Sequence, residues 1–384
     1  MAVITIATLA ACGGGTAQES AKTESGQTQQ QEQKQEPARN KTADELWASI
    51  ADTTQPTLAE YKNIILNYAF ATVNDDFRLE ENASDSVISR LSKDKATFPN
   101  YDDLVFEMMK HEAPQLRRWA LIKTYSLYGM NSQHLNAIKE LIANETNPYV
   151  IHEAINALSN EGKDPVVGQY LLDMSKHENA KIRKAAASAL GNSWSKSVEG
   201  AVDAIITLMN DSDLEVRKIA CKYSGRLANE KIIDPLVAIL NNDADAKLHG
   251  DCMNALATLW YDYPSFENTS EKAYNAFINY LKKTPRTENI PDWTSLSPIS
   301  TKGSAYENWK TGVKYFNVKN FCAVCTELIK DNNTNWLLKT AAIKTIALHG
   351  TKSDLQALKP VIDKLTCKMA DNLKDTYQKE LDKI

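Results

Sequence analysis

The sequence is poor in residues that interrupt helices and contains no long apolar run. Its 384 residues include 14 glycines and 12 prolines, and most of them stand between segments of helical periodicity rather than inside them. No segment reaches the roughly 18 consecutive apolar residues that a membrane-spanning helix needs. The natural fold class is therefore all-α, and any membrane anchor would be a lipid alone.

Basic charge and catalytic motifs are also lacking. The chain carries 44 Lys and Arg against 49 Asp and Glu, a formal net charge of −5, whereas nucleic-acid-binding domains usually have a basic surface. It has no glycine-rich phosphate loop, no H-E-x-x-H sequence and no Ser-His-Asp order. The six histidines include no pair four residues apart, so turn chemistry explains His111 and His177 better than metal binding does. We expect no catalytic residue, cofactor, metal or nucleic-acid partner.

What the sequence does contain is a repeat. The segments HENAKIRKAAASALG (177–191) and DSDLEVRKIACKYSGRL (211–227) are near-copies. Aligning Arg183 with Arg217 also aligns Gly191 with Gly225, at an offset of 34 residues. This offset is a repeat period.

The same register extends in both directions. An apolar residue, here named the opener, begins each second helix, at Leu116, Val150, Ile182, Val216 and Leu248. A small residue follows four positions later, at Ala120, Ala154, Ala186, Ala220 and Cys252. An apolar residue closes each first helix, at Met108, Ile142, Met174, Leu208 and Leu240. A sixth match is predicted at Ile329, Leu337 and Ala341. Such a period with two helices per unit predicts a right-handed α-solenoid of stacked antiparallel helix pairs.

One unit also resembles a known family. The order acid, five residues, Arg after an apolar residue, then Ala is similar to the HEAT repeat, and Asp211, Val216, Arg217 and Ala220 match it best. The resemblance implies a ladder in which acids and arginines tie each unit to the next. The acid column reads His111, Glu145, His177, Asp211, Asp243 and Asn332, and the arginine column reads Arg117, Ile151, Arg183, Arg217, His249 and Leu338. Within a single unit, only one unit carries both an acid and an arginine, namely Asp211 and Arg217. The candidate ladder residues are Arg117, Arg183, Asp211 and Arg217.

The N-terminus resembles a bacterial lipoprotein signal. Residues 1–11 are apolar and end in small residues before Cys12, which the resemblance makes the lipidated residue. Residues 12–41 are rich in Gln, Glu, Lys, Ser and Thr and predict a disordered tether. We therefore expect a lipid-anchored protein of the bacterial cell envelope, on the periplasmic side of the membrane or at the cell surface.

The remaining chain is predicted to divide into three parts. Residues 42–100 match the repeat poorly and are expected to cap the solenoid. Residues 101–270 form the regular repeats, and residues 271–384 form degenerate repeats with a C-terminal cap. A polar, proline-rich insertion at 284–304 is either a surface strap or a binding loop that uses Trp293 as an aromatic anchor.

Basic residues gather in the second helices. Arg118, Lys184 and Lys218 each stand two residues after an opener, and Lys222 lies one turn beyond Lys218. In solenoids the second helices commonly line the concave surface. These residues form either a solvated face or a basic ridge that binds an acidic peptide, protein or polysaccharide.

The cysteines permit a redox interpretation. Cys322 and Cys325 form a C-x-x-C sequence, typical of dithiol exchange when exposed at a helix N-terminus. Their spacing with Ile329 places them instead on the buried stripe of a first helix, which favours core thiols. A bridge between Cys221 and Cys252, on adjacent second helices, stays open because sequence does not fix its geometry.

The sequence therefore predicts a membrane-anchored HEAT-like scaffold that binds a protein or peptide and performs no catalysis. Two alternatives stay open. One is an enzyme, or a subunit of one, with a cleft between the 284–304 loop and neighbouring second helices. The other is a thiol-redox protein.

Overall fold

The computed structural model describes residues 59, 101–126, 130–261, 270–283, 295–296, 299–300 and 315–384. The chain divides into two units, Met1–Asn40 and Lys41–Ile384, and every described residue lies in the second. Within these described residues the regular elements are all helical, which confirms the predicted all-α class. Cys12, Trp293, the tether and, apart from Ala59, the predicted cap at 42–100 lie outside the described residues.

Most of the described helices form pairs of a first and a second helix. The first helices are α4 (Tyr101–Met109), α6 (Ser132–Ile142), α8 (Pro165–Met174), α10 (Ala201–Leu208), α12 (Ile233–Leu240), α14 (Glu271–Leu281) and α16 (Val318–Lys330). The second helices are α5 (Pro114–Ser126), α7 (Pro148–Leu158), α9 (Ala180–Leu190), α11 (Leu214–Ser224), α13 (His249–Tyr261) and α17 (Trp336–His349). Short 3-10 helices join some of them, namely η2 (Ser193–Ser195), η3 (Gly225–Leu227), η4 (Glu230–Ile232) and η5 (Asp243–Leu248). The chain ends with α18 (Lys352–Gln356), α19 (Lys359–Asp363) and α20 (Ala370–Leu381).

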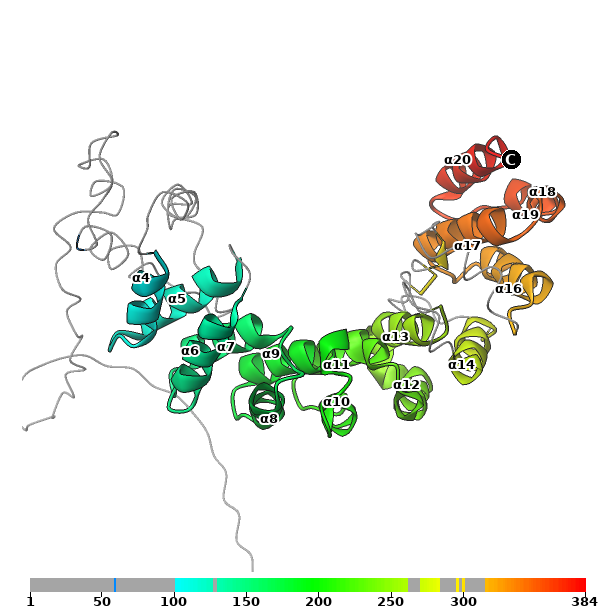
Figure 1. Cartoon of the computed structure of the whole chain (residues 1–384). Coiled ribbons are helices and arrows are strands. Elements are labelled where there is room, and N and C mark those ends of the chain that lie inside the picture. The colour runs from blue at the N-terminus through cyan, green and yellow to red at the C-terminus, as the bar shows by residue number, and fades with distance from the viewer. Residues whose placement is uncertain are drawn as a thin grey trace, which may run out of the picture. The chain divides into compact units, whose positions relative to one another are not determined.

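The second helices stack side by side in sequence order. Helix α5 packs on α7, α7 on α9, α9 on α11 and α11 on α13, while α6, α8, α10 and α12 form a separate row (Figure 1). This two-layer stack of antiparallel pairs is the predicted α-solenoid. At the C-terminal end, α17 packs on α16, α18 and α20.

Side-chain caps begin most second helices. Asn147, Asn179, Asp213 and Asn335 are N-cap residues whose side chains accept backbone N–H groups of the first turn. Such a cap satisfies donors that have no partner inside the helix. In α7, α9 and α11 the opener stands three residues after the cap, so the cap sets the register of the buried stripe.

The repeat columns are the core. All five openers are buried, and so are all five small residues that follow them by one turn. The small residues allow neighbouring helices to approach closely. The repeated glycines do the same at the ends of second helices: a Cβ on Gly191 would lie 2.7 Å from the Cβ of Tyr223, and one on Gly225 would lie 2.4 Å from the carbonyl oxygen of Ala255.

The predicted register of the sixth unit is wrong by one residue. Leu337 is 38% exposed, whereas Leu338 is fully buried at 0%. The turn before α17 is longer than in the regular units. Asp331 and Asp211 each accept the backbone N–H two residues later, but Asp331 lies four residues before the cap Asn335, whereas Asp211 lies two before the cap Asp213. The opener is therefore Leu338, and the small residue is Ala342.

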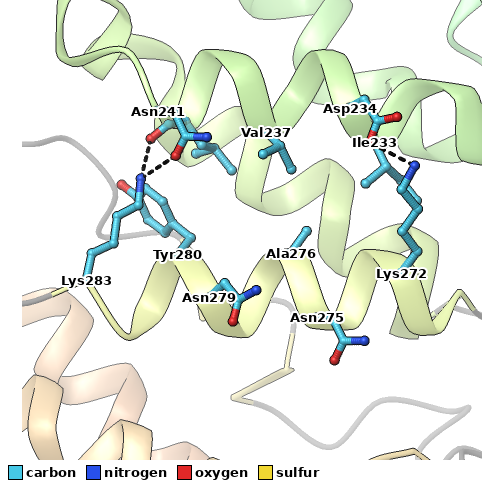
Figure 2. A pocket seen from close by; sticks show the side chains of 11 residues that line it. Ile233, Asp234, Val237, Asn241, Lys272, Asn275, Ala276, Asn279, Tyr280 and Lys283 are labelled. Atoms are coloured by element: carbon cyan, nitrogen blue, oxygen red, sulfur yellow. Dashed lines mark hydrogen bonds and ion pairs between the residues drawn. The ribbon is translucent and has the colours of Figure 1, made fainter.

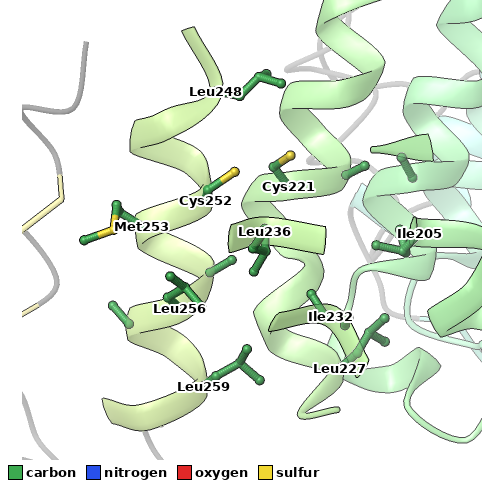
Figure 3. Close-up of a cluster of buried hydrophobic side chains, with 14 of the residues drawn as sticks. Ile205, Cys221, Leu227, Ile232, Leu236, Leu248, Cys252, Met253, Leu256 and Leu259 are labelled. Carbon is green, nitrogen blue, oxygen red and sulfur yellow. The ribbon is translucent and has the colours of Figure 1, made fainter. Parts of the chain in front are cut away.

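Cys221 and Cys252 lie together in the core between α11 and α13. Figure 3 shows them among Leu236, Leu248 and Leu256. Both thiols are free. Burial and the hydrogen-bonding Cys221 thiol raise the pKa of Cys252, so the pair is part of the apolar packing here.

Candidate interaction surface

The outer surface of the second-helix row carries the exposed Lys222 on α11 and the half-buried Lys184 on α9, Lys218 on α11 and Asp251 on α13. Two residues along an α-helix correspond to a rotation of about 200°. Lys184 and Lys218 therefore point away from the buried openers Ile182 and Val216. Three of the four predicted basic side chains thus reach the surface that the stacked second helices share.

The charges on α11 and α13 partly compensate one another. Lys218 Nζ lies 2.8 Å from Glu215 Oε1, and Lys222 Nζ lies 5.3 Å from the ring centroid of Tyr223. Burial raises the pKa of Asp251, while the positive charges of Lys222 and Lys218 oppose that shift. In the part of the chain that the structure describes, Lys184 forms no ion pair. The surface is therefore of mixed charge and most basic at α9.

Arg118 does not belong to this exposed surface, which corrects the predicted ridge. Its side chain is nearly buried, and its Nη2 lies 2.7 Å from Oε1 of Glu153 on α7. Burial alone would raise the pKa of Glu153, but the hydrogen bond from His152 and the Arg118 charge lower it. Glu153 thus neutralises Arg118 inside the protein.

The ladder joins consecutive units rather than closing within one. Arg183 Nε donates to Asp211 Oδ2 at 2.7 Å and Nη2 donates to Oδ1 at 2.8 Å, across an interval of 28 residues. Arg117 Nε donates to Glu145 Oε2 at 2.6 Å across the same interval of 28 residues. The unit-by-unit count therefore missed two complete pairs. The hydrogen bond from each arginine lowers the pKa of its acid, against an opposing effect of burial.

Each ladder arginine also closes the turn of its own unit. Nη1 of Arg117, Arg183 and Arg217 donates to the backbone carbonyl oxygen six residues earlier, at 2.8 to 2.9 Å. One guanidinium thus fixes the turn before its helix and, for Arg117 and Arg183, holds the next unit as well. Its planar fork of five donors suits this double task.

Other residues replace the ladder elements in the remaining units. His111 and His177 stand in the acid column, and their Nδ1 atoms accept the backbone N–H groups of Ala113 and Asn179 at 3.0 Å. The predicted turn chemistry of these histidines is thereby confirmed. His249 stands in the arginine column, where Nε2 lies 3.2 Å from the carbonyl oxygen of Ile239 and Nδ1 lies 3.0 Å from the hydroxyl of Tyr280 in the next helix pair.

Two features of the described residues had no clear signal in the sequence. One is Lys123 on α5, which is 2% exposed and whose pKa burial lowers to about 8. The other is a groove of about 370 Å³ between α12 and α14, with Val237 and Ala276 on its floor (Figure 2). Both features arise from packing between helices, which helical periodicity alone does not reveal.

The polar groups at both ends of the groove are already engaged. Lys272 Nζ lies 2.8 Å from Asp234 Oδ1. At the other end, Lys283 Nζ donates to Asn241 Oδ1 at 2.7 Å and to the carbonyl oxygen of Leu240 at 3.0 Å. These contacts tie α14 to α12 across the two ends of the groove.

The C-x-x-C thiols are buried, as predicted. Cys322 and Cys325 lie on the buried face of α16, and burial raises the pKa of Cys322 to about 11. It raises the pKa of Cys325 further. A raised pKa disfavours the thiolate that dithiol exchange requires.

Within the described ranges, no group of three or more His, Cys, Asp or Glu side chains is arranged to hold a metal ion. A search of the same residues finds no helix with the length and apolar character needed to cross a bilayer.

Comparison with known proteins gives the same architecture. The family model for HEAT repeats matches residues 102–191 and 168–257. A search of curated proteins gives no match.

Several solved structures are similar. One is a chain from a structure whose description states that Kap95p binding induces the switch loops of RanGDP to adopt the GTP-bound conformation. The match has a TM-score of 0.51 and 14% identity. The match covers 84% of this chain and 47% of that one, so this chain spans about half its length. An engineered protein has a TM-score of 0.42 and 13% identity, with 88% of each chain covered. A designed armadillo repeat protein has a TM-score of 0.24 and 16% identity, with 72% of this chain and 97% of that one covered.

Fold and comparisons together define the class of protein. The chain is an α-solenoid, and its residues 102–257 match the family model for HEAT repeats. Solenoids of this class are repeat scaffolds, typical of protein–protein interaction.

Proposed function

We propose that this protein is a membrane-anchored scaffold that binds another protein of the bacterial cell envelope through its second-helix surface. The observation that carries the proposal is the unbroken row from α7 to α13, in which each second helix packs on the next. Such a row offers one extended, rigid surface with many separate contact points. Extended area suits a protein or peptide ligand better than a small molecule.

The charge distribution supports a partner with acidic groups opposite α9. Lys184 forms no ion pair among the described residues, while Lys218 has Glu215 beside it at 2.8 Å. An acidic partner would gain most at Lys184 and could displace Glu215 from Lys218. Complementary charge of this kind mainly governs specificity and the rate of association.

The anchoring part of the proposal rests on the sequence. The apolar residues 1–11, Cys12 and the polar segment 12–41 resemble a lipoprotein signal followed by a tether. One similar chain comes from a structure whose description concerns Kap95p binding and RanGDP. A solenoid on a tether would present its second-helix surface to a neighbour in the envelope.

Affinity capture from detergent-solubilised native membranes tests the binding surface. The intact protein is compared with a Lys184→Glu/Lys218→Glu variant and with a matched control, Lys196→Glu/Lys231→Glu. The control makes the same change in net charge at two exposed lysines outside the second helices. The expected result is a partner retained by the intact protein and the control, and bound at least about tenfold more weakly by the first variant, or roughly 1.4 kcal/mol.

Equal retention by all three proteins would contradict binding through these lysines. The anchor is tested separately by replacing Cys12 with Ser and fractionating cells. We expect the native protein in the membrane fraction, carrying a lipid on Cys12, and the variant in the aqueous fraction. A membrane-bound Cys12→Ser protein would contradict the lipid anchor while leaving the binding surface unaffected.

A further inference from the structure

The ladder position recurs near the C-terminus with a lysine in place of arginine. In α17 the opener is Leu338, so Lys339 stands where Arg117, Arg183 and Arg217 stand in their own helices. Its side chain is 0% exposed. In the part of the chain that the structure describes, its Nζ has no hydrogen-bond partner.

A cysteine occupies the matching acid position. Cys367 follows Lys339 by 28 residues, the same interval that separates Arg117 from Glu145 and Arg183 from Asp211. Cys367 also precedes the N-cap residue of its helix, Met369, by two residues, as Glu145 and Asp211 precede theirs. Helices α17 and α20 pack together. This last junction thus has the spacing, cap position and helix packing of the ladder, with an amine and a thiol at the two ladder positions.

The amine lacks the anion that the Arg117 and Arg183 junctions supply. Burial lowers the pKa of Lys339, while the neighbouring Cys367 and Asp331 act in the opposite direction. Asp331 is held in its own turn, where Oδ1 accepts the backbone N–H of Asn333 at 3.0 Å. A buried cation without a hydrogen-bonded anion is costly, so this junction would gain from a negative charge at Cys367.

Among the cysteines that the structure describes, Cys367 is the most accessible to solvent. It is half-buried, whereas Cys221, Cys252, Cys322 and Cys325 are buried. A small neutral oxidant therefore reaches Cys367 before the others.

We propose that Cys367 is an oxidation site at which peroxide converts the thiol into a sulfinate that takes the carboxylate's place opposite Lys339. The sulfur attacks one oxygen of hydrogen peroxide, so an S–O bond forms, the O–O bond breaks, and water leaves with the thiol proton. The sulfenic acid then reacts with a second peroxide in the same way and gives a sulfinic acid and a second water. Each step removes two electrons from sulfur and reduces one peroxide. The sulfinate has two oxygens and one negative charge, like the carboxylates of Glu145 and Asp211.

The experiment treats the full-length protein with hydrogen peroxide and maps modified peptides by mass spectrometry. Two added oxygen atoms are expected at Cys367, with Cys221, Cys252, Cys322 and Cys325 unmodified. The melting temperature is measured before and after treatment, and it should rise by about 2 °C or more. In Lys339→Met the oxidation should bring no rise, because the partner cation is absent.

Two substitutions keep the test independent of the oxidant. Cys367→Asp should reproduce the stabilisation without peroxide, and Cys367→Ser, the matched control, should be no more stable than the native protein and show no peroxide-dependent rise. The proposal is overturned if buried cysteines are oxidised before Cys367, or if the rise persists in Lys339→Met. A covalent Lys339–Cys367 cross-link in place of the two oxygens would overturn it as well, and so would a Cys367→Asp protein less stable than Cys367→Ser.

Discussion

The four repeat units up to residue 227 and the units after them use the position directly after the opener for different chemistry. In three of these four units an arginine follows the opener and closes its own turn, whereas Ile151 stands there in the second unit. Arg117 and Arg183 also reach the acid of the next unit. Beyond residue 227 the position holds His249, which bridges carbonyl oxygens to Tyr280, and Lys339, which lies opposite Cys367. The arginines, His249 and Lys339 all place a side-chain donor at that position, a requirement that Ile151 does not meet. Arginine meets it best because one guanidinium can serve both a carbonyl and a carboxylate.

The largest effect is expected from breaking an arginine junction. Arg183→Met leaves the largely buried Asp211 carboxylate unpaired and should lower the free energy of unfolding by about 3 to 5 kcal/mol. Hydrogen exchange should show the lost protection at α9 and α11.

The effect of Arg183→Met should depend on pH. The hydrogen bond from Arg183 lowers the pKa of Asp211 below its ordinary value of 3.8. The stabilisation is therefore present above the unfolded-state pKa and is lost as pH falls through the folded-state pKa. Unfolding of native protein and variant is compared at pH 7 and below pH 3.8; a difference that persisted undiminished in acid would contradict the ion pair.

A buried lysine in the regular repeats, Lys123, should also lower the free energy of unfolding, as inferred for Lys339. Burial lowers the pKa of Lys123 from 10.5 to about 8. Between these two pH values the unfolded chain binds more protons, so the native protein should gain stability as pH rises from 8 to 10.5. Lys123→Met should add roughly 3 kcal/mol at pH 7 and lose this gain toward pH 10.5. Urea unfolding at several pH values measures it, and a destabilised variant at pH 7 would contradict it.

A smaller effect is expected at the histidine junction. His249→Phe keeps an aromatic ring but removes the bonds to Ile239, Asn242 and Tyr280. The loss should be about 1 to 2 kcal/mol, less than at Arg183 because no carboxylate loses an ionic partner. Tyr280→Phe serves as the matched variant. A loss at His249 as large as that at Arg183 would show that the junctions do not differ in this way.

The smallest expected effect comes from building a junction that the chain lacks. Ile151 and His177 occupy the arginine and acid positions between the second and third units. The double variant Ile151→Arg/His177→Asp should show a favourable coupling of about 1 kcal/mol relative to the two single variants. A double-mutant cycle in urea measures it, and additivity of the single effects would mean that position alone does not create the ladder.

The sequence predicted the periodic part of the fold well. The openers and the small residues are buried because the 3.6-residue period fixes one face of each helix, and the caps fix where the period begins. The sixth register was wrong because the turn before α17 is longer, and a count across a turn does not reveal its length. In addition, the ladder pairs were missed because the count compared an acid with the arginine of its own unit.

The candidate site was less predictable. Lys184, Lys218 and Lys222 reach the second-helix surface, but Arg118 pairs with Glu153 on the neighbouring helix. Charge pairing between helices depends on their relative rotation, which a one-dimensional pattern does not contain. The groove between α12 and α14 was missed for the same reason, since its lining comes from two separate helix pairs.

The ladder bonds join residues that are 28 positions apart, and this separation affects how the protein folds during synthesis. Each junction needs only the unit that follows it, so local contacts dominate and contact order is low, which favours fast folding. The repeats can assemble one after another as the chain leaves the ribosome. The junction between Lys339 and Cys367 can form only after α20 has been synthesised, because Cys367 directly precedes that helix.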